Sequence, residues 1–193
     1  VVERVKKLIN EDAKERQKKL DELRNNDVLK ELNSLHKQGI EFVEPSDLSG
    51  AIRGRHNLYA HLEYMIKNAE KNVTIMTSSK GLIRKLEALK PELERLSKKG
   101  VKIRIAAPIT KECSNAVKEL GKIAEIKHSN KLNARFCVVD GKDVMFMAMD
   151  DEIVHPSYDI GIWVNTPYFA SALESLFNNT WKDMEDANKN TEK

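Results

Sequence analysis

The segment from residue 72 to residue 106 constrains the fold most strongly, because two short apolar runs flank one long helical pattern. Residues 72–77 and 101–106 are rich in Val, Ile and Thr, which are common in β-strands. Between them, residues 79–99 predict a helix that Pro91 interrupts, and Gly100 follows its end. A strand–helix–strand order favours parallel neighbours joined by a right-handed crossover. The sequence therefore predicts an α/β fold.

The remainder of residues 40–193 continues this alternation of helices and short strands. Helices are expected from about residue 57 to 69 and from Pro167 onward, and residues 140–143 predict a hairpin turn. Pro45, Gly50 and Gly54 indicate a linker ahead of the first of these helices. Further strands are predicted at residues 124–127, 135–140, 144–149 and 159–164.

The N-terminus carries a different, highly charged helical pattern. Residues 2–24 contain no Gly or Pro, and an acidic residue precedes a basic one by four positions at Glu3/Lys7 and Glu15/Lys19. The apolar stripe is too thin to form a core alone, so we expect self-pairing as a coiled coil; the alternative is a helix folded back on its own domain. The sequence thus predicts a helical dimerisation stalk at residues 1–39 and an α/β domain at residues 40–193.

Composition excludes several classes of partner. The net charge of +3 is too small to argue for nucleic-acid binding by itself. Apolar runs fall far short of the roughly 20 residues that cross a bilayer, which predicts a cytoplasmic protein without a membrane partner. Cys113 and Cys137 are expected to be free thiols, and the scattered histidines predict no metal or cofactor. Because the chain begins Val1–Val2 without methionine, we expect an upstream domain to be missing.

Residues 133–141 resemble an active-site strand of the phospholipase D superfamily, which reads His-x-Lys, four residues, then Asp. Asn133 stands at the histidine position, Arg135 at the lysine position and Asp140 at the aspartate position. The resemblance implies that two such histidines face each other, one attacking phosphorus and the other protonating the leaving oxygen. An amide can do neither, whereas Arg135 keeps a positive charge and a planar fork. We therefore expect a binding cleft with no catalytic residue.

The superfamily pattern continues with Gly-Ser and then Asn, where this chain has Met147, Ala148 and Asp151. A carboxylate at Asp151 disfavours a phosphate and would suit a neutral polyol. We expect a ligand at the carboxyl ends of the parallel strands. The candidate lining residues are Thr77, Ser78, Ser79, Asn133, Arg135 and Asp151.

Each of these candidates also has a structural alternative. Ser78 and Ser79 could simply cap the following helix. Arg135 could pair internally with Asp140 or Asp151. Asn133 could only end a strand.

Three further segments resemble the phospholipase D-like domain of TrmB-type archaeal transcriptional regulators: residues 55–79, residues 99–104, and the region from Asp159 through Trp181. The resemblance covers roughly residues 40–185 and implies a mixed sheet flanked by helices. The charged helix ahead of it resembles the coiled coil that, in those regulators, joins a winged helix-turn-helix domain to the effector domain and holds the dimer together. It implies a homodimer through the N-terminal helix, DNA contact through a missing winged-helix domain, and a possible small-molecule effector. Sugar-responsive members carry a further C-terminal domain, so a sugar is not implied here.

The preferred interpretation is the dimerisation and effector-sensing portion of a transcriptional regulator. One alternative is a divergent phosphodiesterase or nuclease that uses another nucleophile, such as His128 or His155. The other is a purely architectural module that spaces two DNA-binding domains.

Overall fold

The structure is a computed structural model of the chain, and it describes residues 6, 13–19, 45–129 and 134–187. The chain divides into two units, residues 1–43 and residues 44–193. In the first unit, residues 13–19 are helical and exposed. Lys19 lies 3.0 Å from Glu15, one helical turn earlier, as the acid-before-base spacing predicts. Most of the predicted stalk lies outside the described residues, and its self-pairing stays a prediction.

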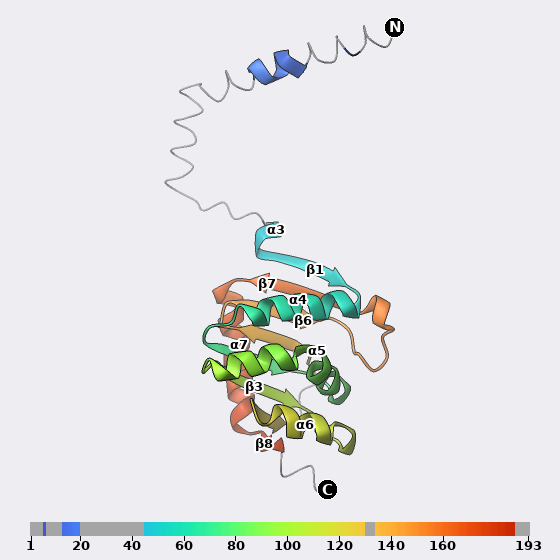
Figure 1. Ribbon diagram of the computed structural model, residues 1–193, viewed down its shortest axis with the longest axis vertical. Helices are drawn as coiled ribbons and strands as arrows, with labels where there is room; N and C mark the ends of the chain where they lie inside the picture. The colour runs from blue at the N-terminus through green and yellow to red at the C-terminus, as the bar shows by residue number, and fades with distance from the viewer. Residues whose placement is uncertain (1–5, 7–12, 20–44, 130–133, 188–193) are drawn as a thin grey trace. The chain divides into compact units, whose positions relative to one another are not determined.

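The second unit is built on one mixed sheet (Figure 1). In the described part of the chain its order is β1-β7-β6-β5-β2-β3-β4-β8. Strand β3 is parallel to both of its neighbours, β2 and β4, and every other neighbouring pair is antiparallel. The strands are β1 (Ser49–Arg53), β2 (Asn72–Met76), β3 (Lys102–Ala107), β4 (Glu125–His128), β5 (Phe136–Val139), β6 (Asp143–Met147), β7 (Ile160–Asn165) and β8 (Glu185–Asp186). The predicted α/β class and the parallel pair around residues 72–106 are confirmed.

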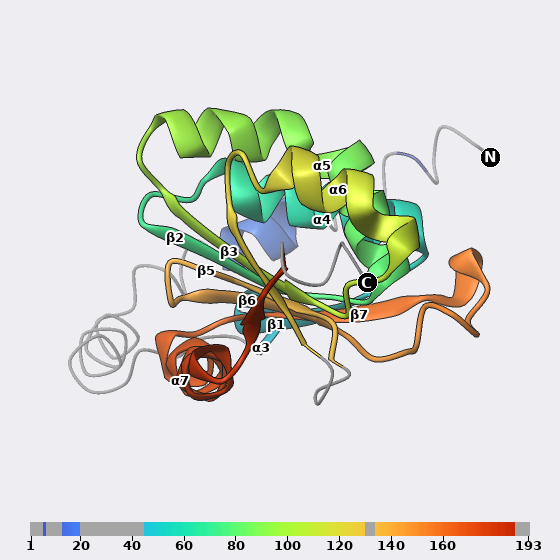
Figure 2. The same cartoon turned by 90° about the horizontal axis from the view of Figure 1, so that it is seen from below.

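Helices cover both faces of this sheet (Figure 2). The first face carries α4 (Arg55–Lys67), α5 (Ser79–Lys98) and α6 (Ser114–Leu120), and the second carries α7 (Pro167–Lys182). Short helical turns are α3 (Pro45–Leu48), η1 (Lys111–Cys113) and η2 (Pro156–Tyr158). Within the described ranges, no helix combines the length and apolar character that a bilayer span requires.

Alternation along the strands divides the buried side chains between two cores. Val73 and Ile75 of β2 pack in the core beneath α4, α5 and α6, whereas Met76 packs in the core beneath α7. In β5, Cys137 and Val139 join the first core, and Phe136 and Val138 join the second. A strand buried on both faces reads as a continuous apolar run, and β5 has that pattern.

Helix α5 continues through Pro91, so the predicted interruption at that residue is wrong. Proline lacks the N–H that would bond the carbonyl of Glu87 and costs a helix interior about 3 kcal/mol. Leucines on both sides of Pro91 are fully buried, and each contributes about 1.5–3 kcal/mol by its burial, which outweighs that loss. These are Leu82, Leu89, Leu93 and Leu96.

Residues 45–53, predicted as a linker, instead form α3 and the edge strand β1. Gly50 pairs with Trp163 of β7, and a Cβ at Gly50 would lie 2.7 Å from the Trp163 Nε1 atom. Glycine therefore lets the indole lie against the strand backbone. The prediction failed because the partner strand is more than one hundred residues away, which local composition does not reveal.

The predicted hairpin joins β5 to β6. Asp140 and Gly141 have φ values of 55° and 63°, and the Lys142 N–H donates to the Val139 carbonyl at 3.0 Å. The Asp140 carboxylate accepts bonds of 2.7–2.9 Å from the backbone N–H groups of residues 70–72. Asp140 therefore ties the hairpin to the start of β2, which stabilises its left-handed backbone.

Candidate functional site

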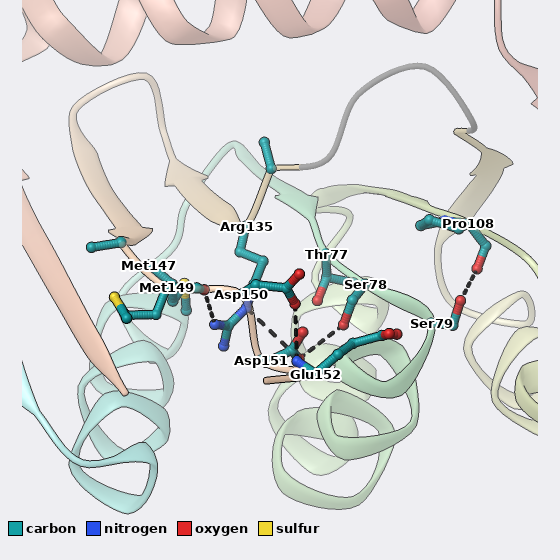
Figure 3. A pocket seen from close by; sticks show the side chains of 12 residues that line it. Thr77, Ser78, Ser79, Pro108, Arg135, Met147, Met149, Asp150, Asp151 and Glu152 are labelled. Atoms are coloured by element: carbon teal, nitrogen blue, oxygen red, sulfur yellow. Dashed lines mark hydrogen bonds and ion pairs between the residues drawn. The ribbon is translucent and has the colours of Figure 1, made fainter. Parts of the chain in front are cut away.

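A cavity of about 380 Å³ opens where β2 and β3 end and β5 begins (Figure 3). Five of the six predicted lining residues border it: Thr77, Ser78, Ser79, Arg135 and Asp151. The sixth, Asn133, lies outside the described residues. The other lining residues are Pro108, Ala134, Met147, Ala148, Met149, Asp150 and Glu152. The cavity thus brings together residues that are far apart in the sequence, since Thr77 and Glu152 are separated by 75 positions.

Ser78 both caps α5 and contacts the opposite wall of the cavity. Its Oγ accepts a hydrogen bond from the Gly81 N–H at 2.9 Å and donates to Asp151 Oδ2 at 2.8 Å. The capping alternative is therefore correct for Ser78, which also borders the cavity. The Ser79 hydroxyl donates instead to the Pro108 carbonyl at 2.6 Å, which joins the start of α5 to the loop after β3.

Glycine is required at position 81, beneath these hydroxyl groups. A Cβ there would lie 2.2 Å from Thr77 Oγ1 and 2.9 Å from Ser78 Oγ. Both oxygens would have to move, and the bond from Ser78 to Asp151 would move with them. Gly81 therefore positions the wall of the cavity that α5 provides.

Arg135 pairs internally, but mainly with a partner that the sequence did not predict. Its Nη1 and Nη2 atoms lie 3.1 and 3.0 Å from the two Asp159 carboxylate oxygens, and Nη1 also donates to the Met149 carbonyl at 2.6 Å. Asp151 Oδ2 lies 3.7 Å from Arg135 Nε, so that alternative is correct at longer range. Pairing with Asp140 is wrong, because Asp140 bonds the backbone of residues 70–72.

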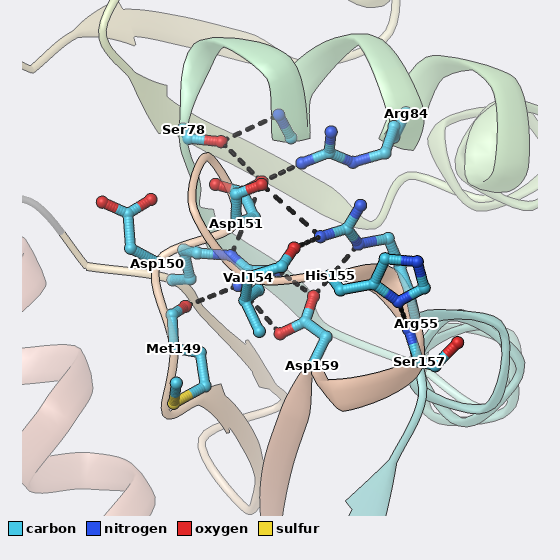
Figure 4. A network of polar contacts seen from close by, with 12 residues as sticks. Arg55, Ser78, Arg84, Met149, Asp150, Asp151, Val154, His155, Ser157 and Asp159 are labelled. Carbon is cyan, nitrogen blue, oxygen red and sulfur yellow. Dashed lines mark hydrogen bonds and ion pairs between the residues drawn. The ribbon is translucent and has the colours of Figure 1, made fainter.

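Asp159 connects Arg135 with a second arginine, Arg55 of α4 (Figure 4). Arg55 Nε donates to Asp159 Oδ2 at 3.1 Å, and the Asp159 side chain is fully buried. Burial alone would raise the pKa of Asp159, but hydrogen bonds and charge from Arg135 and Arg55 together hold that pKa below its usual range. Asp159 therefore stays ionised and holds both guanidinium groups in place.

Asp151 has one committed oxygen and one free oxygen. Its Oδ2 accepts from Ser78 and from Arg84 of α5, beside the longer contact to Arg135. Its Oδ1 is buried and has no hydrogen-bond partner in the part of the chain that the structure describes. The side chain itself has no exposed surface, so this oxygen is a desolvated acceptor in the cavity wall.

Lys85 contacts the lining residue Thr77 and has 2% of its surface exposed. Its Nζ donates to Thr77 Oγ1 at 2.9 Å and lies 5.5 Å from the centre of the Tyr59 ring. Burial, followed by the positive charge of Arg135, lowers the Lys85 pKa to about 7. A substantial fraction of the Lys85 amino group is therefore uncharged near neutral pH.

Sequence reasoning missed four charged residues of this network: Arg55, Arg84, Lys85 and Asp159. One signal was available, because Lys85 occupies the buried stripe of α5 between Leu82 and Leu89. A lysine at an apolar helical position indicates a specific interior partner. The other three are charged residues whose partners are set by strand order.

The two histidines proposed as alternative nucleophiles do not line this cavity. His128 Nδ1 accepts from the Ile109 N–H at 2.9 Å, and His155 Nδ1 accepts from the Ser157 N–H at 3.3 Å. Within the described ranges, no group of three His, Cys, Asp or Glu residues could hold a metal ion. The described lining residues can supply hydrogen bonds and electrostatic attraction to a small ligand.

Comparison with solved structures gives the fold a name. The chain is similar to TrmBL2, an archaeal chromatin protein whose structure shows a novel mode of DNA binding, with a TM-score of 0.57 and 17% identity over 94% of this chain and 69% of TrmBL2. It is also similar to NucT from Helicobacter pylori, with a TM-score of 0.57 and 12% identity over 72% of this chain and 98% of NucT. The phospholipase D family member Nuc from Salmonella typhimurium gives a TM-score of 0.54 and 12% identity over 72% of this chain and 97% of Nuc. At these identities the similarity establishes a phospholipase D-like fold.

The sequence itself assigns the family. No curated protein sequence matches this chain. Residues 50–187 match the family described as transcriptional regulator TrmB, EBD N-terminal subdomain, and this match includes the described residues that line the cavity and all of α7. The chain therefore belongs to the TrmB family of transcriptional regulators, and the unit that contains the cavity is that subdomain.

Proposed function

We propose that this chain is the dimerisation and effector-sensing portion of a TrmB-type regulator, and that its cavity binds a small polar molecule without transforming it. In the whole protein, a preceding winged-helix domain would contact DNA in the cytoplasm, and the stalk would pair two copies. The observation that carries this proposal is the state of the cavity's charged groups. The Arg135 fork is occupied by Asp159, and the lining residue Asp151 has its carboxylate bonded to Ser78 and Arg84.

These contacts argue against phosphodiester chemistry in the cavity. A phosphate needs cationic donors that are free to bind it, but two of the three nitrogens of Arg135 already bond protein oxygens. Asp151 bonds Arg84 and lies near Arg135 Nε, so these cations are already paired within the protein. At the histidine position of the motif the chain carries Asn133, which has no nucleophilic imidazole.

The same contacts support a sensing role, because three separate segments meet at two carboxylates. Asp159 bonds Arg55 of α4 and Arg135 beside β5, and Asp151 bonds Arg84 and Ser78 at α5. A ligand that bonds Asp151 would change the balance of this network. Differential binding to two arrangements of these helices would then couple the cavity to the rest of the regulator.

A ligand screen by thermal unfolding tests the proposal. A specific ligand at 100 times its dissociation constant should stabilise the chain by about 2.7 kcal/mol. The stabilisation should disappear in Ser78→Ala, which removes one contact of Asp151. It should persist in the matched variant Ser114→Ala on α6, which lies outside the cavity.

Two outcomes would replace the proposal. Turnover of a phosphodiester by the native chain that disappears in Asn133→Ala would establish an enzyme. A chemically broad screen that yields no stabilising ligand would favour the architectural spacer.

A further inference from the structure

Most hydrogen-bond donors around the cavity already have a partner within the protein, whereas one acceptor has none among the described residues. This difference indicates what kind of ligand fits. Arg135 uses Nη1 and Nη2 on Asp159 and Met149, and the Ser78 and Ser79 hydroxyl protons are donated to Asp151 and Pro108. Most donors are therefore occupied. Arg135 Nε has no hydrogen-bond partner among the described residues, but it lies 3.7 Å from Asp151 Oδ2 and is ion-paired with it. The Oδ1 atom of Asp151 is an acceptor that likewise has no partner in the described part of the chain, and a ligand that supplies a donor would satisfy it.

Charge points in the same direction. Three consecutive carboxylates, at Asp150, Asp151 and Glu152, line the cavity, whereas Arg135 is the cation among the described lining residues. Asp150 and Glu152 are exposed at the mouth, and Asp151 is 5% exposed. The mouth should therefore attract cations and repel anions. The charges of Asp150 and Glu152 are a separate observation from the missing bond at Asp151 Oδ1, and the two agree.

The rest of the lining is apolar. Five residues contribute apolar surface beside the carboxylates: Pro108, Ala134, Met147, Ala148 and Met149. A cavity of about 380 Å³ with these walls fits a short chain of methylene groups next to a polar end. In the described part of the chain the carboxylates form no cluster that could ligate a metal ion. An organic cation satisfies both kinds of wall.

We infer that the cavity binds an aliphatic primary amine or short polyamine, with one ammonium group bonded to Asp151 Oδ1 and the carboxylates of Asp150 and Glu152 attracting it at the mouth. This inference rests on the proposed effector-sensing function and names the ligand class. It replaces the neutral polyol expected from the sequence. The methylene groups of the amine pack on Met147 and Met149, and the ammonium donates where the protein leaves an acceptor unsatisfied.

Isothermal titration of the whole chain with three probes tests this assignment. The probes are 1,4-diaminobutane, its uncharged counterpart 1,4-butanediol, and inorganic phosphate. We expect binding of the diamine, at least about tenfold weaker binding of the diol, and none of phosphate. The affinity for the diamine should fall as salt concentration rises, because the attraction at the exposed mouth is screened.

Variants localise the binding to the cavity. The double variant Asp150→Asn/Glu152→Gln removes two exposed charges and should weaken diamine binding by about threefold to tenfold, with an unchanged unfolding midpoint. The matched control Glu87→Gln/Asp183→Asn removes two exposed carboxylates outside the cavity lining and should bind like the native chain. Asp151→Asn should abolish binding. If that variant does not fold, the double variant decides.

The outcomes separate this inference from the proposed function. Tighter binding of butanediol or phosphate than of the diamine would overturn the amine assignment and leave effector sensing standing. Diamine binding that ignores both salt and the double variant would place the amine elsewhere and also overturn the assignment. Absence of binding by any probe, followed by a failed ligand screen, would remove both.

Discussion

Arg135 and Asp159 form a two-point ion pair, with Nη1 3.1 Å from Oδ1 and Nη2 3.0 Å from Oδ2. Both side chains are buried, and the pair joins the segment before β5 to the residue before β7. The planar guanidinium matches the carboxylate in both spacing and charge. The guanidinium of Arg135, at the lysine position of the motif, is therefore held in the cavity wall by its bonds to Asp159.

Removing the carboxylate from this pair should be strongly destabilising. Asp159→Asn leaves Arg135 and Arg55 buried without their shared anion, so we expect a loss of about 3–5 kcal/mol in unfolding free energy, measured by urea denaturation. The control Lys102→Gln breaks a contact to Glu125 in which both side chains are about 60% exposed, and its midpoint should not move measurably. Equal effects in the two variants would contradict the assignment of Asp159 as the anchor.

The same pair should contribute to acid sensitivity. Because the folded-state pKa of Asp159 is lowered, its stabilisation is present above the unfolded carboxyl pKa and is lost as pH falls through the folded pKa. The free energy of unfolding of Asp159→Asn should therefore depend less on pH in the acidic range than that of the native chain. An unchanged acid profile would mean that Asp159 has a similar pKa in both states.

Lys85 should make stability rise with pH near neutrality. Its folded pKa is about 7 against an ordinary 10.5, so above pH 7 the unfolded state binds more protons than the folded state. The slope should approach about 1.4 kcal/mol per pH unit until the unfolded Cys137 thiol begins to ionise near pH 9, which acts in the opposite direction. Urea denaturation between about pH 7 and 9 measures it. Lys85→Met should flatten the slope, whereas Lys98→Met at the exposed end of α5 should keep it.

Gly81→Ala should damage the cavity although alanine favours helices by about 1 kcal/mol over glycine. The new Cβ meets Thr77 Oγ1 and Ser78 Oγ, so we expect a net destabilisation of about 1–3 kcal/mol and the loss of ligand-induced stabilisation. Differential scanning fluorimetry with and without the ligand measures both. Glu87→Ala, at an exposed position of the same helix, is the control, and it should retain the ligand response. A stabilised Gly81→Ala that still binds would show that the hydroxyl groups can move freely.

Restoring the histidine of the motif should not restore chemistry. Asn133→His supplies an imidazole, but Arg135 remains bonded to Asp159 and the Asp151 carboxylate still borders the cavity. We expect no hydrolysis of bis(4-nitrophenyl) phosphate above the rate in buffer, followed by absorbance. The native chain serves as the reference. Measurable turnover by the variant would show that the cavity still accommodates a phosphodiester.

Deleting residues 1–38 should convert a dimer into a monomer. The unit from residue 44 onward has its own sheet and cores, so it should stay folded without the predicted stalk. Light scattering gives the mass of both forms, and circular dichroism checks that the truncated chain is folded. An unchanged mass would assign the pairing to the α/β unit instead.

Much of the local structure could be predicted from the sequence, because its signals are short in range. The apolar runs around residues 72–77 and 101–106 indicated two parallel strands, and Asp140–Gly141 indicated the hairpin. Pro91 misled because its local effect on the helix is smaller than the burial of the leucines around it. The edge strand β1 was missed because a glycine-rich segment becomes a strand only beside β7.

The candidate site divides along the same line. The sequence by itself shows that Asn133 replaces the histidine of the motif. It also predicts that five residues approach one end of the sheet, because strand ends and helix starts are local features. These residues are Thr77, Ser78, Ser79, Arg135 and Asp151. Only the tertiary structure decided that Arg135 bonds Asp159, 24 residues away, and that Arg55 joins the same carboxylate from 104 residues away. Ion pairs of this kind depend on which strands lie side by side, and that order is set by packing of the whole sheet and not by any short segment.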